Sequence, residues 1–78
     1  MKTMRVYLGT IEGVKEFVNL TTKIDCDVDI VSGRYVIDAK SIMGIFSIDL
    51  SKPVELRVSA DDERADEAIT LLKKFEAK

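Results

Sequence analysis

Residues 26–38, CDVDIVSGRYVID, decide the fold of this chain. In the first half of the stretch, the apolar residues Val28 and Ile30 alternate with acidic residues. After a break at Gly33, a second run rich in β-formers, RYVID, occupies residues 34–38. Alternation with a period of two is typical of a strand with one buried face, and a short glycine-containing break between two such runs predicts a hairpin.

Two more strands are predicted outside this hairpin. Apolar and polar side chains alternate over residues 4–8, near the N-terminus, and again over residues 54–58, directly after Pro53. Both patterns indicate strands with one face in the core. We expect the first and the fourth strand to tolerate positions at the edges of the sheet.

The sequence also predicts two long amphipathic helices. Apolar residues at three- and four-residue intervals between Ile11 and Ile24 predict the first, with Thr10 as its natural N-cap. A second apolar stripe runs from Ala65 to Phe75. The charges that flank this stripe suit a helix dipole, with the acidic Asp61, Asp62 and Glu63 at the positive end and the basic Lys73, Lys74 and Lys78 near the negative end.

With a short helix after Lys40, the predicted elements follow the order β-α-β-β-α-β-α. The fold class is therefore α+β, an open-faced β-sandwich in which three helices cover one face of a four-stranded antiparallel sheet. The 78 residues show no linker and no internal repeat. A chain of this length supports one modest core, so residues 1–78 are predicted to form a single domain.

The composition argues against two classes of partner. The formal net charge is −2, from 12 basic and 14 acidic residues, and no run of basic residues could follow a phosphate backbone, so nucleic-acid binding is disfavoured. No apolar stretch approaches the roughly 20 residues that cross a bilayer. The single cysteine, Cys26, has no partner for a disulfide within the chain. We expect a cytoplasmic protein.

Most enzymatic chemistry lacks its usual residues. The 78 residues contain no histidine, the commonest general base, the commonest transition-metal ligand and the usual carrier of phosphate on nitrogen. Gly33 and Gly44 are isolated, so neither a dinucleotide-binding nor a P-loop signature exists. No spacing singles out a nucleophile beside a base. We predict no enzymatic activity and no cofactor.

Three aspartates at alternate positions superficially resemble the start of a calcium loop. These are Asp25, Asp27 and Asp29. In such a loop, however, a glycine would stand where Ile30 is and a closing glutamate where Val36 is. We interpret the aspartates as a solvated strand edge, where charge discourages edge pairing, and predict no metal site.

The stretch "KSIMGIF" holds more apolar residues than one face of a two-turn helix can bury. Ile42 can face the core together with Ile45 or with Phe46, which leaves Met43 and part of the remaining pair accessible. An exposed cluster of this kind marks a protein-docking site more often than chance.

Ser41 precedes this short helix and has two interpretations. Its hydroxyl can simply cap the helix by accepting a backbone hydrogen bond. Alternatively, it can take a phosphate, which would place nearly two negative charges at the positive end of a helix and next to Lys40. A capping serine beside an apolar patch could therefore be a regulatory switch.

Residues 23–46, KIDCDVDIVSGRYVIDAKSIMGIF, resemble the HPr family, the small phosphocarriers of the bacterial sugar phosphotransferase system. The resemblance extends without a gap from about Ile11 to the end of the chain, and its most recognisable block, "KSIMG", is complete. It implies an HPr-like fold. It also implies that a dedicated HPr kinase/phosphorylase modifies Ser41. The implied docking patch comprises Ile42, Met43 and Phe46, with Lys40 beside it, and a catabolite control transcription factor is an implied partner.

The chain departs from the family at the start of the first long helix. Ungapped counting from "KSIMG" places Thr10, Ile11, Glu12 and Gly13 where the family has its His-x-Arg-Pro motif. Thr10 thus stands at the position of the active histidine. We therefore predict that the protein cannot relay phosphate, and that Glu12 would repel an incoming phosphoryl group.

These observations leave two main hypotheses. The first is a regulatory protein of the phosphotransferase system, acting through phosphorylation at Ser41 and the docking patch. The alternative is an interaction or decoy module with the HPr fold in which Ser41 is only a cap. Self-association through the patch is open under both. A small hydrolase of the acylphosphatase type has a similar element order, but the stretch between Asp38 and Val54 offers neither its long helix nor its anion-binding loop.

Overall fold

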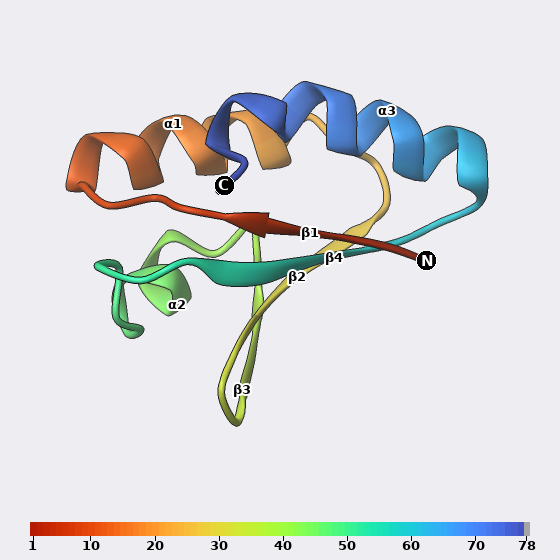
Figure 1. The fold of residues 1–78 in the computed structure, drawn as a ribbon. Coiled ribbons are helices and arrows are strands. Elements are labelled where there is room, and N and C mark those ends of the chain that lie inside the picture. Colours follow the sequence, from red (N-terminus) through yellow and green to blue (C-terminus); the bar gives the residue numbers. More distant parts are fainter. Residues whose placement is uncertain (78) are drawn as a thin grey trace.

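The computed structural model describes residues 1–77 and confirms the predicted order of elements (Figure 1). Lys78, predicted to lie near the negative end of the last helix, is outside the described residues. Within the described part, no helix is long and apolar enough to span a membrane. The elements are β1 (Lys2–Val6), α1 (Ile11–Thr21), β2 (Asp27–Ser32), β3 (Tyr35–Asp38), α2 (Ile42–Phe46), β4 (Val54–Ser59), α3 (Asp62–Leu72) and a final 3₁₀ turn, η1 (Lys73–Phe75).

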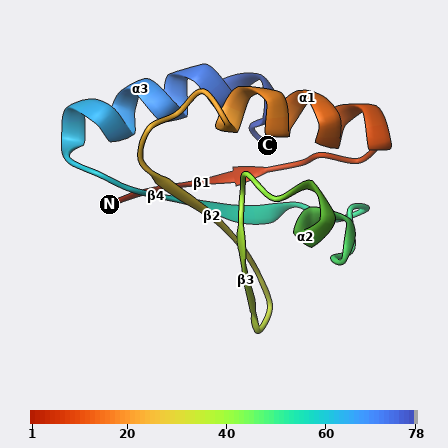
Figure 2. The same ribbon diagram turned by 180° about the vertical axis from the view of Figure 1, so that it is seen from behind.

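The four strands form one antiparallel sheet in the order β1-β4-β2-β3. Figures 1 and 2 show α1 and α3 side by side over one face of this sheet, with α2 beside β3. The expectation that the fourth strand suits an edge is wrong, because β4 lies between β1 and β2. Its apolar residues, Val54, Leu56 and Val58, are all buried, as a central strand requires.

The first strand begins and ends two residues earlier than predicted. Leu8 is nevertheless buried, although it lies beyond β1. The far end of the chain pairs with the backbone at this edge of the sheet. The Tyr7 N–H donates to the Phe75 carbonyl (2.9 Å), and the Ala77 N–H donates to the Arg5 carbonyl (2.9 Å). The exposed edge of β1 is thus partly covered by residues 75–77.

The core lies between the sheet and the helices, where Phe17 of α1 meets Phe75 edge to face, with 5.3 Å between ring centroids. The apolar stripe of the first helix is shorter than predicted. Ile11, at its start, is 58% exposed. Ile24 is buried but follows the helix, which ends at Thr21. The last helix carries its predicted buried stripe, because Ala65, Ala68, Leu72 and Phe75 are all buried.

The predicted hairpin is present, and its turn depends on Gly33. This residue has φ of +60°, a conformation that glycine adopts without strain. The turn sets the register in which Ser32 faces Tyr35 and Asp29 faces Asp38. Strand β3 is therefore one edge of the sheet, and its Val36 remains 62% exposed.

The acidic residues of β2 do not lie at a strand edge, which corrects their interpretation. Strand β2 has partners on both sides, so Asp27 and Asp29 project from the sheet face opposite the helices. In the register, Asp29 lies directly opposite both Arg57 of β4 and Asp38 of β3. No group of three potential ligands within residues 1–77 is placed to hold a metal ion.

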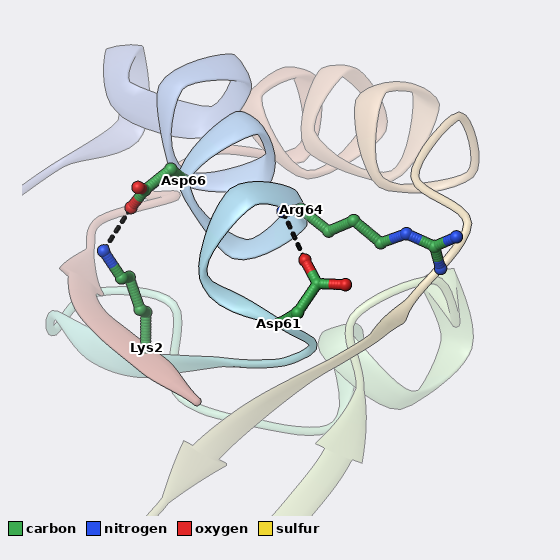
Figure 3. A network of polar contacts seen from close by, with 4 residues as sticks. All are labelled: Lys2, Asp61, Arg64 and Asp66. Carbon is green, nitrogen blue, oxygen red and sulfur yellow. Dashed lines mark hydrogen bonds and ion pairs between the residues drawn. The ribbon is translucent and has the colours of Figure 1, made fainter.

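Polar contacts fix the first half of α3. The Asp61 carboxylate accepts a hydrogen bond from the Arg64 N–H (2.9 Å) and caps the helix, while Asp66 pairs with Lys2 of β1 (Figure 3). The hydrogen bond to Asp66 raises the pKa of the Lys2 ammonium above its ordinary value. The ion pair with Lys2 links α3 to the sheet. Helix α2, by contrast, contains no charged side chain.

Candidate functional site

Helix α2 is a single short turn that Ser41 caps. The Ser41 Oγ accepts a hydrogen bond from the Gly44 N–H (3.2 Å), and the Ser41 carbonyl accepts one from the Ile45 N–H (3.1 Å). The predicted capping role is thereby confirmed. Ser41 is half-buried, so part of its side chain still faces solvent. The same hydroxyl is the residue for which phosphorylation is predicted.

Gly44 allows α2 to pack closely on β3. A Cβ at this position would lie 2.7 Å from Cγ2 of Ile37 and 3.2 Å from Oγ of Ser41. No real Cβ tolerates the shorter separation unless the isoleucine side chain moves. The glycine thus sets the distance between the short helix and the edge strand, and with it the position of Ser41.

The structure resolves how the excess of apolar residues in α2 is distributed. Ile45 is completely buried and Ile42 is half-buried. Met43 is 77% exposed and Phe46 is 39% exposed. Of the two predicted pairings, Ile42 with Ile45 is the one that faces the core, and Met43 is accessible as predicted. A flexible methionine and an aromatic ring therefore stand on the surface directly after the capping serine.

Helix α1 anchors the segment that leads into α2. The buried hydroxyl of Thr21 donates a hydrogen bond to the carbonyl of Ala39 (2.8 Å), and Ala39 is itself completely buried. This link crosses from the last turn of α1 to the residue two positions before Ser41. Thr21 falls on the helical stripe predicted between Ile11 and Ile24, and the sequence pattern assigned it no further role. A threonine on such a stripe was the available signal, since a buried hydroxyl needs a partner.

Asp38 organises the two residues before α2 and was missed by sequence reasoning as a site residue. Its Oδ1 accepts a hydrogen bond from the Lys40 N–H (2.8 Å), and its carbonyl accepts one from the Ser41 N–H (3.0 Å). Asp38 and Lys40 also line a small hollow of about 60 Å³ together with Asp27 and Asp29. The half-buried Lys40, which is predicted to lie beside the docking patch, thus lines a hollow to which three aspartates also contribute.

Thr10 caps α1 in the same way as Ser41 caps α2, which confirms the prediction for this residue. Its Oγ1 accepts a hydrogen bond from the Gly13 N–H (2.9 Å). A Cβ on Gly13 would lie only 2.3 Å from the Leu8 carbonyl oxygen, so this position requires glycine. Thr10 and Glu12 are both exposed. The start of α1 therefore presents a hydroxyl and a carboxylate to solvent.

A hydrogen bond from the segment before α1 to the loop after α2 brings the two capped helices together. The Gly9 N–H donates a hydrogen bond to the Leu50 carbonyl (3.2 Å), which places the segment before α1 beside the segment after α2. In the same loop, hydrogen bonds from the side chain and backbone N–H of Ser51 lower the pKa of the Asp49 carboxyl below its ordinary value. The two capped helices thus lie on neighbouring parts of the structure.

The fold and this site define a class of protein, a small α+β open-faced sandwich with a capped short helix and apolar side chains on its surface. Residues 13–78 match the family model PTS-HPr, described as the PTS HPr component phosphorylation site. The chain therefore belongs to the HPr family of the phosphotransferase system. Thr10, Ile11 and Glu12 precede the matched range.

Solved structures agree with this assignment. HPr-C-His from Thermoanaerobacter tengcongensis is 28% identical, with a TM-score of 0.79 over 95% of this chain and 89% of that one. The phosphocarrier protein HPr from Bacillus anthracis is 24% identical, with a TM-score of 0.75 over 97% and 96% of the two chains. A histidine-containing phosphocarrier protein from Mycoplasma is 16% identical, with a TM-score of 0.75 over 94% and 89%. The last two likenesses concern the fold alone. None of the curated protein sequences matches the chain.

Proposed function

We propose that this protein is a regulatory member of the HPr family that is phosphorylated on Ser41, binds partner proteins through the docking patch and does not carry phosphate on histidine. The docking patch consists of Ile42, Met43 and Phe46, with Lys40 beside it. The proposed partners are proteins of the phosphotransferase system or of catabolite regulation in the cytoplasm. They include an HPr kinase/phosphorylase and a catabolite control transcription factor.

The exposure of α2 is the observation that carries this proposal. A helix that buries Ile45 completely while leaving Met43 77% exposed has kept an apolar side chain in water. Methionine is flexible and polarizable, which suits a surface that binds protein partners. Ser41 immediately precedes this surface, so a charge placed on its hydroxyl would change the edge of the docking patch.

The chemistry of the modification is a single phosphoryl transfer. The Ser41 Oγ forms a bond to the γ-phosphorus of ATP, the bond from that phosphorus to its bridging oxygen breaks, and ADP and the hydroxyl proton are released. The product carries between one and two negative charges near neutral pH. The Gly44 N–H, which now donates to Oγ, can then donate to a phosphoryl oxygen. Lys40 supplies a positive charge one residue away.

The start of α1 supports the absence of phosphate relay. By ungapped counting from "KSIMG", Thr10 stands at the position of the family's active histidine, and a threonine phosphate is a stable ester rather than a rapid donor. Glu12 in the first turn adds negative charge where an incoming phosphoryl group would need positive charge. The proposed role is therefore that of a binding protein rather than a carrier or an enzyme.

Incubation with a cognate HPr kinase and ATP tests the proposal. Intact mass and peptide mapping should show one phosphoryl group on the wild-type chain and none on Ser41→Ala. Thr10→Val, which removes the matching hydroxyl from the other capped helix, should be modified like the wild type. Absence of incorporated phosphate, or incorporation that Ser41→Ala leaves unchanged, would contradict the proposal.

A second candidate function is an unphosphorylated interaction or decoy module with the HPr fold. It is favoured by the hydrogen bond from the Gly44 N–H to the Ser41 Oγ, which accounts for the serine without any modification. Under this alternative the kinase leaves the chain unmodified. Ser41→Ala then lowers the free energy of unfolding by about 1 kcal/mol and leaves partner binding unchanged.

A further inference from the structure

We propose that Asp38 and Lys40 have opposite effects on a phosphoryl group at Ser41, Asp38 holding it closer to a single negative charge and Lys40 closer to two. This inference rests on the proposed function, because it takes Ser41 as the modified residue. Beyond that function, Asp38 and Lys40 together set the charge of the phosphoryl group on Ser41, and this charge changes with pH near neutrality.

The backbone turn before α2 places the Asp38 carboxylate close to Ser41. The amide N–H groups of Lys40 and Ser41 are adjacent in the chain, and both donate to Asp38, one to Oδ1 (2.8 Å) and one to the carbonyl (3.0 Å). The hydrogen bond at Oδ1 orients the exposed Asp38 side chain towards the backbone of this turn. A phosphoryl group on Ser41 would share the turn with a fixed negative charge.

Two further carboxylates strengthen the effect of Asp38. Asp29 lies directly across the β2–β3 register from Asp38, an arrangement in which like charges repel. Asp27 lies on the same sheet face and lines the same hollow as Asp29, Asp38 and Lys40. Three acidic residues and one lysine therefore line the same hollow before any phosphate is added.

The other charges near this hollow leave Lys40 as the available cation. Arg57 faces Asp29 from β4, but its Nε donates to Oε2 of Glu55 at 2.7 Å. The residues of α2 carry no charge. The last four residues of α1, whose Thr21 bonds to Ala39, carry none either. Within residues 1–77, Lys40 takes part in no ion pair. It can therefore turn from the carboxylates towards a phosphate.

Coulomb's law gives the size of the effect for charges on neighbouring residues of one turn. A unit charge about 7 Å from a phosphate, in surroundings close to water, shifts the second pKa of the phosphate by about 0.4 units. A negative neighbour raises this pKa because it disfavours the doubly charged form, and a positive neighbour lowers it. The second pKa of phosphoserine is about 6, so shifts of this size change its charge near neutral pH.

The test uses the full chain with phosphoserine installed at position 41 by stop-codon suppression, so that no kinase is required. A ³¹P NMR titration then gives the second pKa of the phosphate. Asp38→Asn should lower it by about 0.4 units, because the asparagine keeps an oxygen for the Lys40 N–H but removes the charge. Lys40→Gln should raise it by a similar amount.

Asp25→Asn is the matched control, because Asp25 is an exposed aspartate of the same stretch that does not line the hollow. It should shift the pKa by less than about 0.1 units, as screening at physiological salt predicts for a more distant charge. The inference is overturned if Asp38→Asn gives the same pKa as Asp25→Asn, or if Lys40→Gln leaves it unchanged. Failure of an HPr kinase to phosphorylate Ser41 would instead contradict the proposed function. The titration needs no kinase, so its outcome is independent of that result.

Discussion

The starts of α1 and α2 have nearly the same local geometry but different surroundings. In each, a hydroxyl at the N-cap accepts a hydrogen bond from a glycine N–H three residues later, at 2.9 Å for Thr10 and Gly13 and at 3.2 Å for Ser41 and Gly44. At each glycine an added Cβ would meet a close neighbour, a backbone oxygen at Gly13 and the side chain of Ile37 at Gly44. The comparison teaches that cap geometry alone does not mark a regulatory site.

The surroundings separate the two caps. Around Thr10, the first helical turn carries the exposed carboxylate of Glu12. Around Ser41, the first turn carries no acidic residue, Lys40 precedes the serine, and Met43 is exposed. A phosphoryl group therefore meets the Glu12 carboxylate at one cap, and at the other it meets Lys40 and an apolar surface as well as the Asp38 carboxylate. Four experiments can break or sharpen this comparison.

The largest expected effect concerns the two glycines. Gly13→Ala should lower the free energy of unfolding by about 3 kcal/mol, because the new Cβ meets a backbone oxygen that cannot move cheaply. Gly44→Ala should cost about 1 kcal/mol, because the obstacle is the side chain of Ile37 and alanine favours a helix. Urea denaturation measures both, and equal losses would mean that the two caps are equally rigid.

The next effect concerns the exposed apolar residues beside each cap. Met43→Asp should weaken binding to a partner of the docking patch by about 2 kcal/mol, or roughly 30-fold, because a charge replaces an apolar contact. Ile11→Asp is the matched control at the other helix, since Ile11 is 58% exposed and follows Thr10. Isothermal titration calorimetry should show little change for this control. A binding constant that Met43→Asp leaves unaltered would contradict a docking role for α2.

The smallest effect concerns the caps themselves. Thr10→Ala and Ser41→Ala should each lower the free energy of unfolding by about 1 kcal/mol, since each removes one hydrogen bond to a helix N–H. Thermal unfolding measures the two losses side by side. If only one variant were destabilised, the geometric equivalence of the caps would be wrong.

The sequence was sufficient to predict the type and order of the elements, because each helix or strand has a residue pattern of its own. The alternation around Gly33 predicts the hairpin, and the stripe that ends at Phe75 predicts the last helix. The excess of apolar residues in the short helix predicts that Met43 is exposed. The central position of β4 could not be read in this way. Strand order depends on which apolar faces meet in space, and the alternation in β4 is the same as that in β1.

The candidate site was predictable in part for the same reason. Ser41 and Met43 lie in one short segment, so their roles as cap and exposed side chain follow from local spacing. The hydrogen bond from Thr21 to Ala39 spans 18 residues, and the proximity of Asp38 to Asp29 depends on hairpin register. These contacts arise from tertiary structure, which a pattern within one element does not encode.

The central claim is that phosphate reaches Ser41 by the kinase route and does not reach the start of α1 by the carrier route. The most direct measurement is the intact mass of the chain after parallel incubations, one with HPr kinase and ATP and the other with phosphorylated enzyme I. Our account predicts one added phosphoryl group, mapped to Ser41, in the first incubation and none in the second. An unmodified chain after the first incubation, or a phosphoryl group gained in the second, would contradict it.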